Sequence, residues 1–295
     1  MTLDVYPLRL RFVARDDLAF PPGAAANILR GAFGLLLRRV ACLPACDDSR
    51  HCERRADCAY ARIFQPAAAS GPSGFADRPR PFVFRAAHLD GRNFNPGDPF
   101  HLDVHLFDTG ESTAAHIVQA FAQLGHEGIG PGRRKADLVA AGSACDALAD
   151  GPLRLPLDMR PRGVSRIRVR FVTPTEIKAA GGLSARPEFG VLFARVRDRI
   201  GALRAFYGAG PLDIDCKAMG ERAGRVRMTR CELSTVEVLR RSSRTGKTHS
   251  IGGFVGLAEY AGELDEFLPY LEAARWTGVG RQTVWGKGEI ALEEI

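Results

Sequence analysis

The chain has 295 residues, of which 45% are hydrophobic and 25% charged, a balance typical of globular proteins that excludes a disordered chain. This length accommodates two domains of ordinary size, each with its own core. No apolar run approaches the length of a membrane span, and the amino terminus lacks the basic-then-apolar pattern of a secretory signal. We therefore expect a cytoplasmic protein with no membrane partner.

The charge of the chain favours a polyanionic partner. The formal net charge is +7, and the basic excess falls after residue 150. All but five of the 41 basic residues are Arg, whose planar guanidinium makes bidentate contacts with phosphate and stacks on bases. The composition thus indicates RNA binding, centred on the second half of the chain.

The first regular elements are a strand and a helix. Residues Leu8–Val13 (LRLRFV) alternate apolar and basic side chains, which predicts a strand with one buried and one charged face. Residues 27–40 place Leu29, Phe33, Leu36 and Val40 on one stripe at helical spacing.

A cysteine-rich insert follows this helix, at about residues 42–64. Its four cysteines are separated by three, five and five residues, and few neighbours can build a core. Thiolates prefer tetrahedral zinc, and a metal would replace the missing core, so we expect a structural zinc site. A reduced metal-free loop and an iron–sulfur cluster remain open alternatives. The predicted ligands are Cys42, Cys46, Cys52 and Cys58.

The rest of the first half continues with extended stretches at residues 82–84 and 100–107, a helix near 113–124, and a last strand after a glycine loop. The loop, Gly128–Gly132, leads directly into three consecutive cations. A solvated charge run is the ordinary interpretation, and RNA contact is the alternative. The cations are Arg133, Arg134 and Lys135.

The second half repeats this order. Ile167–Val172 (IRVRFV) nearly copies the first strand, and an apolar helix at 189–203, two extended stretches at 225–240 and 251–260, a helix near 264–275 and a glycine loop follow. The order strand-helix-strand-strand-helix-strand occurs twice. We therefore predict an α+β protein of tandem ferredoxin-like (βαββαβ) domains, at 1–150 and 157–295, with the cysteine-rich insert in the first.

The second glycine loop, Gly278–Gly288, is the strongest candidate for RNA contact. Glycines let the backbone approach a phosphate, while the loop's Arg, Lys and Gln side chains add charge and hydrogen bonds. Trp285 either packs in the core or stacks on a base. The expected RNA-binding residues here are Gly278, Gly280, Arg281, Gln282, Gly286, Lys287 and Gly288.

These segments resemble the CRISPR-associated repeat-RNA-processing endoribonucleases of the RAMP superfamily. The similarity is carried by Gly252–Gly256, Phe267–Leu271 and the loop 278–288 at the carboxy-terminal end, and by Leu29–Gly34 and Cys58–Phe64 near the amino-terminal end. The resemblance implies metal-independent cleavage of the CRISPR precursor RNA within each repeat, yielding guide RNAs. It implies repeat RNA as the partner, with other CRISPR effector subunits as further candidates, and no catalytic cofactor.

The catalytic residues are harder to assign from the sequence. Relatives often place a histidine in or just after the first helix, and none occurs there in this chain. Cleavage needs a group that titrates near neutral pH, with cations to stabilise the phosphate. Among the histidines, His249 has the most favourable cationic neighbours, because Arg241, Arg244 and Lys247 precede it in a predicted hairpin. Tyr60 and His51, in the insert, are the next candidates, and His126 follows.

Two other functional classes stay open at this stage. A non-catalytic RNA-binding subunit of a CRISPR effector complex would explain the missing helix histidine. A zinc-stabilised DNA-binding regulator is a weaker alternative, because no helix-turn-helix pattern is present.

Overall fold

A computed structural model describes residues 1–42, 52–66, 78–145, 151–179, 182–241 and 248–295. The chain divides into two compact units. The amino-terminal unit holds residues 4–153 with Phe206–Gly208, and the carboxy-terminal unit holds Met1–Leu3, Arg154–Ala205 and Ala209–Ile295. No helix within the described residues is long and apolar enough to cross a membrane.

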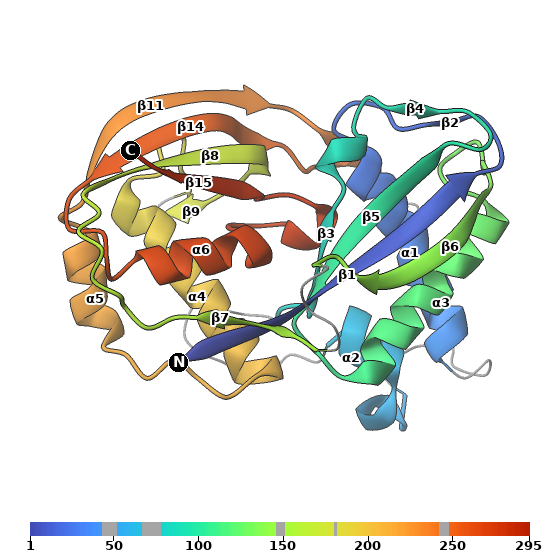
Figure 1. Ribbon diagram of the computed structural model, residues 1–295, viewed down its shortest axis with the longest axis horizontal. Helices are drawn as coiled ribbons and strands as arrows, with labels where there is room; N and C mark the ends of the chain where they lie inside the picture. Colours follow the sequence, from blue (N-terminus) through green and yellow to red (C-terminus); the bar gives the residue numbers. More distant parts are fainter. Residues whose placement is uncertain (43–51, 67–77, 146–150, 180–181, 242–247) are drawn as a thin grey trace. The chain divides into compact units, whose positions relative to one another are not determined.

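The amino-terminal unit is a sheet with helices on one face (Figure 1). Its elements in chain order are β1 (Thr2–Ala14), β2 (Leu18–Ala19), α1 (Ala25–Ala41), η1 (Arg55–Asp57), α2 (Ala59–Phe64), β3 (Phe82–Arg85), η2 (Ala87–Leu89), β4 (Asn93–Phe94), β5 (Pro99–Leu106), α3 (Glu111–Glu127) and β6 (Ala136–Ser143). The main strands run in the order β3-β5-β1-β6, with antiparallel neighbours. Helices α1 and α3 pack against each other.

The carboxy-terminal unit repeats this plan. Its elements are β7 (Leu153–Pro156), β8 (Arg166–Thr175), β9 (Lys178–Ala179), β10 (Gly182–Leu183), α4 (Phe189–Tyr207), α5 (Cys216–Ala223), β11 (Arg227–Val236), β12 (Leu239–Arg241), β13 (Thr248–Ser250), β14 (Gly253–Ala261), α6 (Leu268–Thr277), η3 (Thr283–Trp285) and β15 (Ile290–Glu294). Its main sheet has the order β11-β14-β8-β15, again antiparallel. Helices α4 and α6 lie along one side of it (Figure 1).

The two sheets share one topology. Numbered along the chain, the four main strands of each unit lie in the spatial order 2-3-1-4, and a helix follows the first and the third strand. This is the split βαβ arrangement of the ferredoxin-like fold, so the predicted fold class is confirmed.

Two details of the carboxy-terminal unit differ from the predicted elements. Helix α6 begins at Leu268 rather than near 264, because Pro269 is tolerated only in the first turn of a helix. Helix α5 was not predicted. Its start is set by Asp215, whose carboxylate accepts hydrogen bonds from the amides of Lys217 (3.0 Å) and Ala218 (2.9 Å).

Phenylalanine packing joins α1 to α2 in the amino-terminal unit. The ring of Phe33 lies 6.0 Å from that of Phe64 and 5.1 Å from that of Phe121. The Phe64 ring also lies over Gly34, where an added Cβ would be 2.2 Å from its Cζ atom. Helix α2 can pack this closely on α1 only because residue 34 has no side chain.

We predict that Gly34→Ala destabilises the protein by about 1–3 kcal/mol, the usual cost of overpacking a core. Phe64 cannot easily move away, because it stacks with Tyr60 and lies under the guanidinium of Arg30. Urea unfolding measures the change. Gly31→Ala, in the same helix with nothing within 4 Å of an added Cβ, is the control and should stabilise by up to about 1 kcal/mol. Equal effects of the two changes would contradict this packing.

Candidate nucleic-acid interface

The glycine-rich loop of the carboxy-terminal unit is folded tightly against the end of β8. A Cβ at Gly280 would lie 2.3 Å from the carbonyl oxygen of Glu176, and one at Gly288 would lie 2.0 Å from that of Val279. Gly278, Gly280, Gly286 and Gly288 all have φ between 70° and 78°. The glycines are therefore required by close backbone approach and by positive φ.

The loop uses several of its amides internally. The amide of Val279 donates to Gly288 (2.9 Å), that of Arg281 to Glu176 (2.9 Å), and that of Gly288 to Pro174 (3.1 Å). These amides cannot also cradle a phosphate. An anion bound at this loop would therefore be contacted mainly by side chains.

The loop's two cations lie in different environments. Arg281 is half exposed and forms an ion pair with Glu176, a carboxylate that is itself only 11% exposed. Lys287 is buried, with 4% of its surface exposed. Trp285 is half-buried. As folded, the loop presents Arg281 to solvent and keeps Lys287 inside.

The loop also touches the hairpin that carries the first catalytic candidate. The side-chain amide of Gln282 donates to the carbonyl oxygen of Ser250 (3.3 Å), at the end of β13. His249 precedes Ser250 in this strand and pairs with Arg240 of β12. The structure thus brings the backbone of His249 beside the glycine-rich loop. The side chains of Arg241 and His249, and the whole of Arg244 and Lys247, lie outside what the structure describes.

The glycine loop of the amino-terminal unit is a tight turn that displays cations. Ile129 and Arg134 exchange backbone hydrogen bonds of 2.7 and 3.0 Å across it. Arg133, at φ 47°, reaches Glu127 at 3.9 Å. Arg134 and Lys135 are exposed and form no ion pair with any described residue. Their charges are thus available to an external anion.

Arginines of the carboxy-terminal sheet form a network that sequence reasoning did not single out. On β8, Arg166 and Arg168 approach Glu259 at 3.7 and 2.7 Å, and Arg230 of β11 approaches it at 3.5 Å. The hydrogen bond from Arg168 holds the pKa of Glu259 below its ordinary value. Arg170 is more than half exposed and lies 3.9 Å from Glu293. The alternation of Arg along this strand was the available signal.

A histidine pair lies on the sheet of the amino-terminal unit. The rings of His88 and His101 stack at 4.3 Å, and Asp103 lies 4.0 Å from Nε2 of His101. Strand pairing sets His101 opposite Arg11 and Asp103 opposite Arg9. Burial and the neighbouring His88 lower the pKa of His101, so its imidazole is neutral near pH 7. The sequence does not mark these two histidines as a pair, because their proximity depends on the fold.

The other catalytic candidates are poorly placed or not described. Tyr60 is buried in α2, where burial raises the pKa of its hydroxyl and Gln65 donates to it at 3.3 Å. A buried phenol that holds its proton is not suited to act as a base. His51 lies outside the described residues. His126, in the last turn of α3, is exposed.

Three of the four predicted metal ligands lie together. Cys42, Cys52 and Cys58 line one cavity of about 250 Å³, and none of them is disulfide-bonded. Cys46 lies outside the described residues. Among the described residues, no three His, Cys, Asp or Glu side chains are already arranged as a metal cluster.

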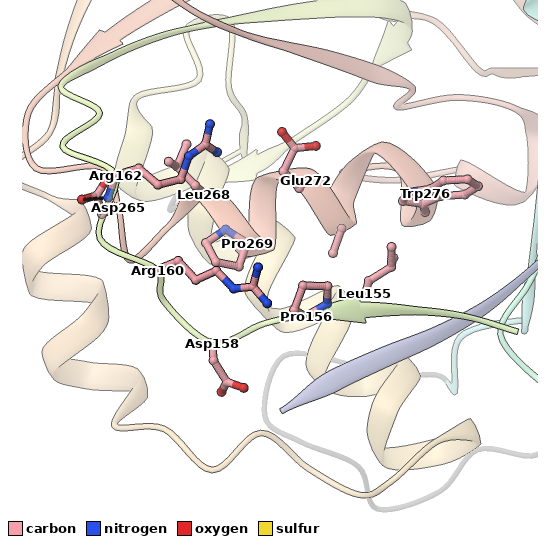
Figure 2. A pocket seen from close by; sticks show the side chains of 11 residues that line it. Leu155, Pro156, Asp158, Arg160, Arg162, Asp265, Leu268, Pro269, Glu272 and Trp276 are labelled. Atoms are coloured by element: carbon pink, nitrogen blue, oxygen red, sulfur yellow. Dashed lines mark hydrogen bonds between the residues drawn. The ribbon is translucent and has the colours of Figure 1, made fainter. Parts of the chain in front are cut away.

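A larger cavity of about 350 Å³ lies along α6 (Figure 2). Pro269, Ala273 and Trp276 form an apolar wall, and Trp276 comes two residues before Gly278. The side chain of Arg160 points along the cavity toward Pro156 (Figure 2) and forms no ion pair with the described residues. The cavity therefore combines an apolar wall with charged side chains of both signs, since Asp158, Asp265 and Glu272 also line it.

Comparisons with known proteins bear on both units. A family model described as the CRISPR-associated endoribonuclease Cas6 matches residues 169–290, and one described as an N-terminal domain matches residues 3–149. No curated protein matches the chain in sequence.

Several solved structures share the fold. A Thermus thermophilus Cas6 in its product complex is 17% identical, with a TM-score of 0.60 over 99% of this chain and 100% of that one. A second Cas6 product complex is 20% identical, with a TM-score of 0.54 over 98% and 100%. A Cas6-RT-Cas1–Cas2 complex is 12% identical, with a TM-score of 0.58 over 99% of this chain and 46% of that chain.

The duplicated ferredoxin-like topology, the glycine-rich loop closing the second unit and the family match over residues 169–290 all agree. Residues 169–290 thus match the family of the CRISPR-associated endoribonuclease Cas6, and the chain as a whole shares the fold of solved Cas6 structures.

Proposed function

We propose that this endoribonuclease cleaves CRISPR precursor RNA within its repeats without a metal ion, and that the glycine-rich loop and the β12–β13 hairpin hold the scissile phosphate. The family match over residues 169–290 supports the reaction class. The contact between Gln282 and Ser250 supports the location, because it places a half-exposed Arg281 next to the strand that contains His249.

The chemistry requires three roles. A base takes the proton of the 2′-hydroxyl, whose oxygen attacks the adjacent phosphorus. The bond from phosphorus to the 5′-oxygen breaks as the new bond forms, and an acid protonates the leaving oxygen. Cations stabilise the charge that builds on the phosphoryl oxygens. We assign one of the two proton transfers to His249 and phosphate stabilisation to Arg281. Further cations of the hairpin are Arg241, Arg244 and Lys247.

Exposed cations of the amino-terminal unit would bind the RNA outside the scissile position. Arg134 and Lys135 have no ion-pair partner among the described residues, and Arg133 has only a distant one. Such groups gain the most from a phosphate, because no internal carboxylate has to be displaced first. Other CRISPR subunits are candidate partners of the resulting complex, as in the similar Cas6-RT-Cas1–Cas2 assembly.

The first prediction concerns the metal requirement. Labelled repeat RNA mixed with the protein and excess EDTA at the same moment should be cut at the same single-turnover rate as without EDTA, because proton transfer needs no catalytic metal. Added Mg²⁺ should give no acceleration. A rate that falls in EDTA and returns with Mg²⁺ would contradict the mechanism, and binding without any cleavage would indicate the non-catalytic RNA-binding subunit.

The second prediction concerns Arg281. Arg281→Ala should weaken repeat-RNA binding and lower the slope of log affinity against log salt by about 0.7, the contribution of one phosphate contact on a single strand. Glu176→Gln keeps the backbone contact and removes the competing carboxylate, so it should strengthen binding. Titrations at several salt concentrations measure both. If neither variant changes the slope, the loop is only a turn.

The third prediction concerns His249. His249→Ala should slow single-turnover cleavage by about a hundredfold or more and leave the binding affinity nearly unchanged, the usual result of removing a general acid or base. His116→Ala is the matched control, since this half-buried histidine on α3 hydrogen-bonds its own helix, at Ser112. Cleavage by His249→Ala at the native rate would move the role elsewhere. His101 would then be the first choice, because its neutral imidazole lies opposite Arg11 and near Asp103.

A further inference from the structure

The cysteine cavity lies where two helices of the amino-terminal unit meet. Cys42 is the residue that ends α1, and Cys58 is the residue that precedes α2. Cys52 begins the short described segment between them and accepts a hydrogen bond from the amide of Arg55 (3.0 Å) at its carbonyl. The three thiols therefore come from three separate points of the chain and line one cavity.

This corner of the unit contributes little to the core. The 3-10 helix η1 (Arg55–Asp57) has no buried residue, and among the described residues the sulfur of Cys58 makes a weak 4.0 Å contact with the carbonyl oxygen of Ala41. By contrast, the far end of α2 is anchored by Phe64 against Gly34. Segments too polar to form a core are commonly stabilised by a bound metal.

We propose that Cys42, Cys52 and Cys58 bind one zinc ion, a structural site that ties the end of α1 to the start of α2. Zinc is the metal that thiolates favour in closed tetrahedral sites. Each thiol loses its proton on binding, so three thiolates around Zn²⁺ leave one negative charge. Arg54 and Asp57 line the same cavity, and the guanidinium of Arg54 can offset part of the negative charge.

The cavity is a hollow rather than a preformed cluster, so binding has to draw the thiols together. Metal binding should therefore depend on each of the three thiols. The metal would have a structural role and take no part in RNA cleavage.

The test is the metal content of the full-length protein purified without added metal. We expect about one zinc per chain by elemental analysis, and a loss of at least about nine-tenths of it in Cys42→Ser, Cys52→Ser and Cys58→Ser. Cys145→Ser and Cys231→Ser are the matched controls, since both are half-buried thiols elsewhere in the chain, and they should keep the metal.

A second measurement guards against variants that fail to fold. A thiol-reactive mercurial added to the native protein should release zinc in step with modification of the cavity thiols, as followed with a colorimetric zinc indicator. Three results would overturn the proposal: a metal-free native protein with freely titratable thiols, zinc lost equally from the control variants, or iron with visible absorption in place of zinc, as an iron–sulfur cluster would give.

Discussion

The backbone of the glycine-rich loop lies directly against the end of β8, and the arrangement of the carboxy-terminal site depends on this contact. A side chain at Gly280 would meet the carbonyl of Glu176, and one at Gly288 would meet that of Val279. Because the loop cannot move outward without losing the hydrogen bonds of Arg281 and Gly288, it is a rigid support. Arg281 and Gln282 project from it at set positions, and Gln282 connects it to β13. A loop held this way can position a phosphate, since binding does not have to order it first.

The distribution of ion pairs explains why the basic composition does not translate uniformly into a basic surface. In the carboxy-terminal sheet, Glu259 gathers Arg166, Arg168 and Arg230 and offsets part of their charge. A buried carboxylate orders the guanidinium groups around it, but it also neutralises part of their positive charge. Arg134 and Lys135 have no such partner among the residues that the structure describes. Charge counting along the chain places the excess in the second half, whereas uncompensated cations occur in both units.

The amino-terminal unit depends on a different constraint, the close packing of α2 on α1. Phe64 can lie over Gly34 only because that residue lacks a Cβ, and the packing leaves the opposite end of α2 to the cysteine cavity. The two ends of this short helix thus differ: an aromatic ring anchors one, and three thiols line a cavity at the other. Helices this short have little stability of their own, so the packing of Phe64 matters.

The sequence by itself determined the fold class, because alternation in LRLRFV and IRVRFV and helical spacing in residues 27–40 are local patterns that report burial directly. It also marked the cysteines and the glycine loops. Only the tertiary structure decided which charged groups reach solvent: Lys287 is buried while Arg281 is half exposed, although both belong to one loop. The stacking of His88 on His101, 13 residues apart, likewise follows from how a strand and a neighbouring turn pack. Burial, pairing and the proximity of distant residues depend on contacts across the fold, and no local pattern carries them.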